Sequence, residues 1–180
     1  MLPVWTLEGT NRSLTNIPIL IIIFLYLDPD KIMTNFADDG YCFVCGPKNA
    51  IGLKLDFSFD GRTITTEFTP QKVHQGYMNI VHGGIISTLL DEVMVKLAIE
   101  LGMPAVTAHM DVRLRQAVAI GKKITFRAEI RESTRKLIIA YAKAETDDGM
   151  VADSTGKLIR IEFQKKDSRG RGGGDASEKI

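Results

Sequence analysis

Hydrophobic residues recur at two different spacings between residues 33 and 163, and these spacings divide the stretch into one helix and several strands. From about residue 84 to residue 101 they recur every three or four positions, as on the buried face of a helix, and Gly102 and Pro104 mark its end. Six shorter stretches alternate or are rich in β-branched residues, as strands do: residues 53–60, 63–68, 106–116, 124–131, 137–145 and 150–163. The pattern predicts an α+β fold in which an antiparallel sheet of about six strands wraps one long helix.

The expected helix has three sides of different character. The broad apolar side, which should press on the sheet, contains Ile86, Leu89, Leu90, Val93 and Leu97. A second side carries charged residues at four-residue spacing and predicts a solvated stripe: Glu92, Lys96 and Glu100. The third side holds Asp91 among mostly small neighbours: Gly84, Ser87, Thr88, Val95 and Ala98.

Asp91 and the two glycines at the start of the helix each allow two interpretations. A lone aspartate on a helix is most often a surface carboxylate. Small neighbours weaken that interpretation, because they let a second helix or a ligand approach, and a partly desolvated carboxylate is a better base. Gly83 and Gly84 either relieve crowding or present bare N–H groups at the positive end of the helix to an anion or a polarised carbonyl.

The spacing of Gly83 and Asp91 adds a geometric argument. They are eight residues apart, which is about 12 Å along one helix, so the two groups of one helix cannot both contact one carbonyl. If two copies of the helix lie antiparallel about a twofold axis, Gly83 of one copy comes beside Asp91 of the other. The sequence therefore predicts a homodimer with two shared sites.

Composition and the terminal segments indicate how many domains the chain forms and which partners it does not attract. With 44% hydrophobic residues and a net charge of +1, the chain suits one ordinary domain without a bulk attraction to nucleic acid or membrane. The apolar run of residues 17–27 is too short to span a bilayer, and no signal-peptide cleavage site follows it. We expect residues 1–32 to be an upstream extension, residues 33–163 the working domain, and residues 164–180 a disordered polar tail.

Cys42 and Cys45 are the only cysteines, too few for a disulfide framework and compatible with a cytoplasmic location. Their C-x-x-C spacing resembles half of a zinc site, but it supplies two ligands where a structural site takes four. The histidines are scattered. We therefore expect two small residues packed near a turn and no metal.

A resemblance to a known family is carried by CFVCGPKNAIGLKL (residues 42–55), by HGGIISTLLDE (residues 82–92) and by the GKK turn and strands that follow. Residues 41–163 closely resemble the hotdog-fold acyl-CoA thioesterases of the phenylacetate-degradation (PaaI-like) type, most specifically in the spacing from HGG to the aspartate. The resemblance implies a hotdog fold, dimers joined edge to edge and often paired into tetramers, and hydrolysis of acyl-CoA thioesters with no metal or other cofactor.

Carried over to this chain, the family's catalytic carboxylate falls on Asp91, and the amide that polarises the thioester carbonyl falls on Gly83. The hydroxyl that helps to place the water falls on Thr107, a looser match. His82 is a candidate for contact with the carbonyl, although we favour a structural hydrogen bond. Some relatives carry an asparagine where this chain has Gly76; Gln75, Asn79 or a water molecule is the candidate substitute for it, and Gly84 is a further substrate-binding candidate.

A thioester suits such a site independently of the family. Its carbonyl is activated and its thiolate is a good leaving group, so one carboxylate and one oxyanion donor suffice. Asp91 acts either as a base toward water or as a nucleophile that forms an anhydride; the sequence leaves both open. A non-catalytic acyl-CoA-binding or regulatory protein is the rival interpretation, favoured by Gly76, and a hydratase or dehydratase is a third.

Coenzyme A also needs cationic partners for its phosphates. Eight basic residues lie between residues 113 and 136, and most should be solvated on the outer face of strands. The better phosphate candidates are Arg113, Arg115, Lys122 and Lys123. Aromatic residues do not interleave with these charges, which disfavours single-stranded nucleic acid as a partner.

Overall fold

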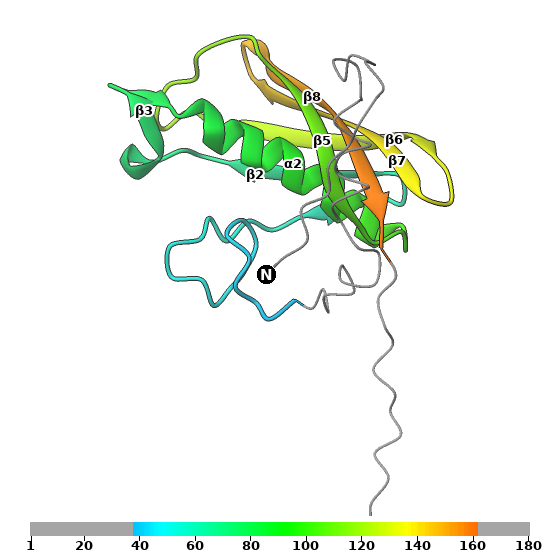
Figure 1. Cartoon of the computed structure of the whole chain (residues 1–180). Coiled ribbons are helices and arrows are strands. Elements are labelled where there is room, and N and C mark those ends of the chain that lie inside the picture. Colours follow the sequence, from blue (N-terminus) through cyan, green and yellow to red (C-terminus); the bar gives the residue numbers. More distant parts are fainter. Residues whose placement is uncertain (1–37, 162–180) are drawn as a thin grey trace, which may run out of the picture. The chain divides into compact units, whose positions relative to one another are not determined.

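The computed structural model describes residues 38–161, so the expectations for residues 1–32 and 164–180 lie outside the described residues. Within this range an α-helix, α2 (Gly83–Glu100), packs on a six-stranded antiparallel sheet (Figure 1). The strands, in sheet order, are β1 (Ser58–Phe59), β2 (Thr63–Phe68), β6 (Ile124–Ser133), β7 (Leu137–Thr146), β8 (Gly149–Arg160) and β5 (Ala105–Leu114). The predicted helix and antiparallel sheet are confirmed.

Further short elements, which the sequence did not predict, lie in the polar segment before the helix. A 3-10 helix, η1 (Lys72–His74), leads into a small two-stranded sheet of β3 (Gln75–Tyr77) and β4 (Ile80–Val81). This segment holds the first turn of α2 in place, since the His82 N–H donates to the His74 carbonyl at 2.8 Å. None of the helices between residues 38 and 161 has the length and hydrophobicity needed to cross a bilayer.

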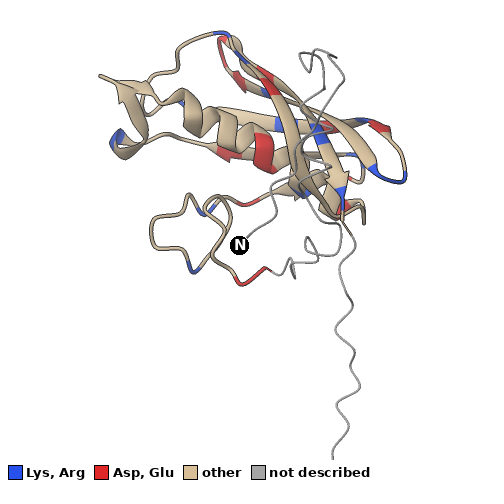
Figure 2. Cartoon of the chain, in the orientation of Figure 1, with Lys and Arg blue, Asp and Glu red and all other residues tan. Residues whose placement is uncertain are grey.

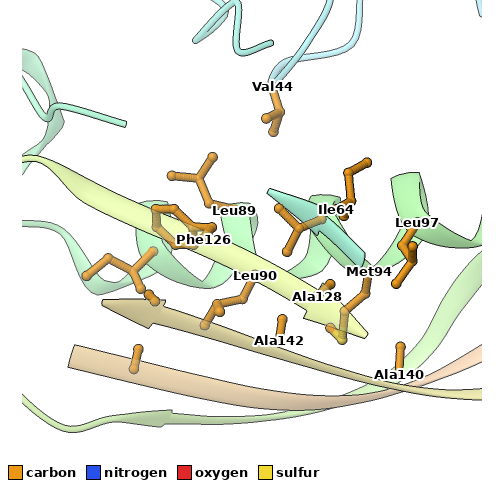
Figure 3. Packing of buried hydrophobic residues seen from close by; sticks show 14 of the residues in the cluster. Val44, Ile64, Leu89, Leu90, Met94, Leu97, Phe126, Ala128, Ala140 and Ala142 are labelled. Carbon is orange, nitrogen blue, oxygen red and sulfur yellow. The ribbon is translucent and has the colours of Figure 1, made fainter. Parts of the chain in front are cut away.

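The core forms between α2 and the inner faces of the central strands (Figure 3). All five residues predicted for the apolar side of the helix are buried, and Met94 and Ala98 are buried with them. Strand β7 contributes mostly small side chains, with Ala140, Ala142 and Ala144 fully buried, so the helix approaches the sheet closely. Gly156 of β8 serves the same purpose, because a Cβ there would lie 2.9 Å from the Met94 Cε.

The first predicted strand is wrong over most of its length, because only Ser58–Phe59 of residues 53–60 pairs in the sheet. The alternation does reflect burial: Leu53, Leu55 and Phe57 pack against the core, and the residues between them are exposed. However, the N–H groups of Leu53 and Leu55 donate to carbonyls of residues 43 and 44, at 2.8 and 2.9 Å. Residues 53–55 therefore bond to the loop at residues 43 and 44 and not to the sheet.

The predicted solvated stripe on α2 is also wrong for two of its three residues. Glu100 is exposed, but Glu92 and Lys96 are half-buried, because the loop that carries Cys42 and Cys45 covers them. Ala98, which the sequence assigned to the side of Asp91, lies in the core. The covered flank of the helix is therefore wider than periodicity indicates.

Strand β5 lies at one edge of the six-stranded sheet and pairs with β8 alone. Its register shifts between Thr107 and His109, which leaves Ala108 as an extra residue. A shift of one residue exchanges the two faces of a strand. The side chains that face the core are accordingly at 105 and 107 before the bulge, and at 110 and 112 after it.

Candidate active site

Asp91 and Thr107 meet where the middle of α2 passes the edge strand β5. The Thr107 Oγ1 donates a hydrogen bond of 2.5 Å to the Asp91 Oδ1, and both residues are half-buried. Figure 2 shows a red, acidic segment on α2. The structure thus brings together two residues that the sequence proposed as partners, with a hydroxyl oriented on a carboxylate.

The bulge at Ala108 places a second residue of β5, Leu114, against α2. Thr107 and Leu114 are seven residues apart on β5, so in a regular strand they would face opposite sides. With one extra residue between them, both face α2: Thr107 reaches Asp91, and the Leu114 Cδ1 lies 2.6 Å from the position that a Cβ on Gly83 would occupy. Residue 83 is therefore a glycine because Leu114 fills the space beside it.

The first turn of α2 is capped by His82. Its Nδ1 accepts a hydrogen bond from the Gly84 N–H at 2.8 Å, a structural bond of the kind favoured above. The helix starts one residue earlier than predicted. The Ser87 and Thr88 hydroxyls bond to the carbonyls of Gly83 and Gly84. Among residues 38–161 the Gly83 N–H donates to no acceptor, and it lies at the positive end of the helix.

A largely apolar cavity of about 280 Å³ opens beside Gly83. Its walls come from β3, β4, the first turn of α2, the end of β5 and the residues that follow β5: Tyr77, Ile80, Val81, Gly83, Ile86, Leu114, Arg115, Gln116, Ala117 and Val118. This volume is near the lower end of the range for small-molecule sites. Tyr77 is 84% exposed and Leu114 53% exposed, so the cavity is open in a single copy of the chain.

The other substrate-binding candidates before the helix are arranged around a turn. The Gln75 Oε1 accepts a hydrogen bond from the Asn79 N–H at 3.2 Å, and Asn79 adopts a positive φ of 63°. Gly76 packs on His82, since a Cβ there would lie 3.1 Å from the His82 Cδ2. Among the residues described, the Asp91 carboxylate bonds to Thr107, and neither Gln75 nor Asn79 reaches it.

The four phosphate candidates do not converge on one surface. Figure 2 shows basic residues spread over the strand ends and loops. Arg115 lines the cavity beside Gly83 and pairs with Asp153 at 2.5 Å, which raises the pKa of Arg115 above its ordinary value. Arg113 lines a different, polar pocket of about 320 Å³ that also contains Arg131.

The two lysines lie near the turns that flank β6. Lys122 pairs with Asp148, and this hydrogen bond raises the pKa of Lys122. Lys123 pairs with Glu67 at 3.1 Å. Arg115 is therefore the candidate that lies beside the helix N-terminus.

A second cluster of reactive side chains, which the sequence did not predict, lies on another flank of α2. The Cys42 Sγ donates to the Glu92 Oε1 at 3.6 Å, and Cys45 and Lys96 lie beside them. Burial raises the pKa of the Cys45 thiol to about 12, opposed by a hydrogen bond with Lys96 and reinforced by Glu92. The spacing of Glu92 and Lys96 was visible in the sequence, but the loop that covers them was not.

Residues 78–152 match the family model described as thioesterase superfamily. Over 95 residues, 52% of the chain, the sequence is 28% identical to mouse acyl-coenzyme A thioesterase 13. That alignment spans 64% of the length of the mouse protein.

Two solved structures show the same fold. The PaaI protein from the phenylacetic acid degradation operon of Escherichia coli has a TM-score of 0.58 at 20% identity, over 62% of this chain and 82% of its own. A hypothetical thioesterase from Streptococcus pneumoniae, solved with coenzyme A, has a TM-score of 0.58 at 17% identity, over 62% of this chain and 88% of its own. The helix and wrapped sheet therefore form a hotdog fold. The resemblance to the hotdog-fold thioesterases is confirmed in the fold and in the match of residues 78–152 to the thioesterase superfamily.

Proposed function

We propose that the protein hydrolyses an acyl-CoA thioester to a free acid and coenzyme A. The observation that carries the proposal is the 2.5 Å hydrogen bond from Thr107 to Asp91, on the same helix whose N-terminus presents the Gly83 amide. Asp91 acts as the base or the nucleophile, and Thr107 orients the water beside it. The family match over residues 78–152, which contain both groups of α2, supports this chemistry.

The S. pneumoniae structures give a further point of support. Two of them carry alanine in place of an aspartate or of a threonine, and these positions are sixteen residues apart. Asp91 and Thr107 have the same separation in this chain. The same protein binds coenzyme A, which supports an acyl-CoA substrate here.

The Gly83 amide serves as the oxyanion donor, and it comes from a second copy of the chain. Because β5 is an edge strand, two copies can pair along it in antiparallel fashion. If the twofold axis passes between Met110 and Asp111, Thr107 of one copy faces Leu114 of the other. Since Leu114 lies against Gly83 and Thr107 against Asp91, this pairing brings the amide of one copy toward the carboxylate of its partner.

Exposed apolar residues in the segment before α2 support the dimer. Val73, Tyr77 and Met78 are each more than 80% exposed, and they precede the first turn of α2. An apolar surface of this kind marks an interaction site more often than free surface. The acyl group would enter the cavity beside Gly83, with Arg115 available to a phosphate of coenzyme A. Pairing of dimers into tetramers remains part of the proposal.

The test is release of free thiol from a panel of acyl-CoAs by the purified chain and by Asp91→Asn. We expect turnover by the wild type and a loss of at least a hundredfold in the variant, with unchanged circular dichroism. Sedimentation of the wild type should give a dimer or a larger assembly. A monomer that turns over substrate would refute the shared site, because one helix holds its two groups about 12 Å apart.

The rival function is acyl-CoA binding without turnover, and one observation favours it. At Gly76, where some relatives carry asparagine, a Cβ would press on His82 at 3.1 Å, so the site has lost a polar side chain and the space for it. Micromolar binding of acyl-CoA without thiol release supports the rival. Conversion of a C=C bond without thiol release indicates a hydratase or dehydratase.

A further inference from the structure

The cluster on the second flank of α2 brings together three side chains of types that can bind a metal ion. One ligand atom from each of Cys42, Cys45 and Glu92 lies within 4.8 Å of the other two. The three residues are half-buried and come from two elements that are far apart in sequence, the loop and the helix. Successive helix residues point about 100° apart, so Glu92 faces this loop while Asp91 faces β5. The cluster is therefore separate from the candidate active site.

We propose that Cys42, Cys45 and Glu92 bind a zinc ion that fastens the loop to α2. In tetrahedral zinc sites the metal lies about 2.3 Å from sulfur and about 2.0–2.2 Å from carboxylate oxygen. These lengths place two ligand atoms of one site about 3.5–3.8 Å apart. The Cys42 Sγ and Glu92 Oε1 are already 3.6 Å apart, and because all three ligand atoms lie within 4.8 Å of one another, the full cluster needs a contraction of about 1.3 Å at most.

The turn that carries the two cysteines is closed and fixed. The Gly46 N–H donates to the Cys42 carbonyl at 2.9 Å, which holds the cysteines on one side of the turn. A Cβ on Gly46 would lie 2.4 Å from the Cys42 backbone nitrogen, so this buried position requires glycine. Val44, between the cysteines, is 3% exposed and packs into the core. The two sulfurs are thereby presented to the helix by backbone geometry.

Lys96 balances the charge of the proposed site. Two thiolates and one carboxylate around a divalent cation leave one excess negative charge. Lys96 follows Glu92 by one helical turn, is half-buried, and contacts Cys45. A cation beside a coordinating sulfur is the kind of outer partner that stabilises metal thiolates. Zinc is the metal that suits two soft sulfurs and one oxygen, with water as the fourth ligand.

A zinc ion here would have three protein ligands and one water instead of the four protein ligands of a closed structural site. It would link the loop to α2, since residues 38–57 form no strand or helix and need other links to the core. Binding displaces the two thiol protons and holds both elements together. Because the ligands are absent from the Asp91 side of α2, the zinc takes no part in thioester hydrolysis.

The test is metal content and metal affinity of the purified full chain. We expect about one zinc per chain by mass spectrometry of the metal, retained through gel filtration. Glu92→Gln should weaken zinc binding, measured by competition with a chromogenic chelator, by at least tenfold. Glu100→Gln is the matched control, because Glu100 is an exposed carboxylate on the same helix.

Absorption spectra of the Co²⁺-bound chain and thermal unfolding test the metal site without an activity assay. Added Co²⁺ should give the visible bands of a tetrahedral ion and a thiolate charge-transfer band, both lost in Cys42→Ser. Zinc should raise the melting temperature of the wild type but not of Glu92→Gln. Equal zinc binding by wild type and Glu92→Gln, or formation of a Cys42–Cys45 disulfide in a chain that binds no zinc, would overturn the proposal.

Discussion

Replacement of Thr107 by valine tests whether the hydroxyl positions Asp91. Valine keeps the shape of the side chain and removes the donor of the 2.5 Å bond. Hydrogen bonds to charged groups contribute about 1.5–3 kcal/mol. If the bond persists in the transition state, its loss should lower kcat about 10-fold to 150-fold. KM should change little, because Thr107 holds the carboxylate and the water.

The assay is thiol release under saturating acyl-CoA, with Thr107→Ser and Thr125→Val as companions. Serine retains the hydroxyl and should restore most of the rate. Thr125 is a half-buried threonine of β6, distant in sequence from the site, and its valine variant should be as active as the wild type. A Thr107→Val rate within twofold of wild type, or a serine variant as slow as valine, would refute the positioning role.

Three further predictions concern the site and the fold. Gly83→Ala places a Cβ 2.6 Å from the Leu114 Cδ1, so it should lower kcat at least tenfold in the thiol-release assay, and Leu114→Ala combined with it should recover part of the loss. Gly156→Ala forces a Cβ to within 2.9 Å of the Met94 Cε. It should lower the free energy of unfolding by about 1–3 kcal/mol in urea titrations, whereas Gly121→Ala, at a turn where a Cβ meets open space but φ is +86°, tests strain alone. Asp60 accepts hydrogen bonds from Thr63 and the Arg62 N–H, and these lower its pKa from 3.8 to about 2. Its stabilising effect is therefore present above pH 3.8 and should vanish as the pH falls toward 2, so the stability of Asp60→Asn should converge with that of wild type in acid but not at pH 6.

Periodicity predicted the features of this structure that are determined within a single helix or strand. The apolar side of α2 was predicted in full, because helical spacing determines which residues share a face. Asp91 and Thr107 were proposed as partners through the family resemblance, and the structure brings them into contact.

The features that the sequence did not predict arise from contacts between different segments of the chain. Alternation at residues 53–57 indicated burial correctly but could not tell that these residues pair with their own loop. Glu92 and Lys96 have ordinary surface spacing, and nothing local reveals that a cysteine-bearing loop covers them. The extra residue in β5 also leaves no signal in the sequence, since it is extra only relative to the register of the neighbouring strand β8.

That extra residue, Ala108, divides β5 into two parts. Before it, Ala105 faces the core and Thr107 reaches Asp91; after it, Met110 and Val112 face the core and Leu114 lies against Gly83. Deletion of one residue here would turn the side chains of one part to the opposite face of the sheet, because a regular strand could keep only the other part facing α2. A one-residue deletion in β5 should thus harm the protein more than most substitutions along it.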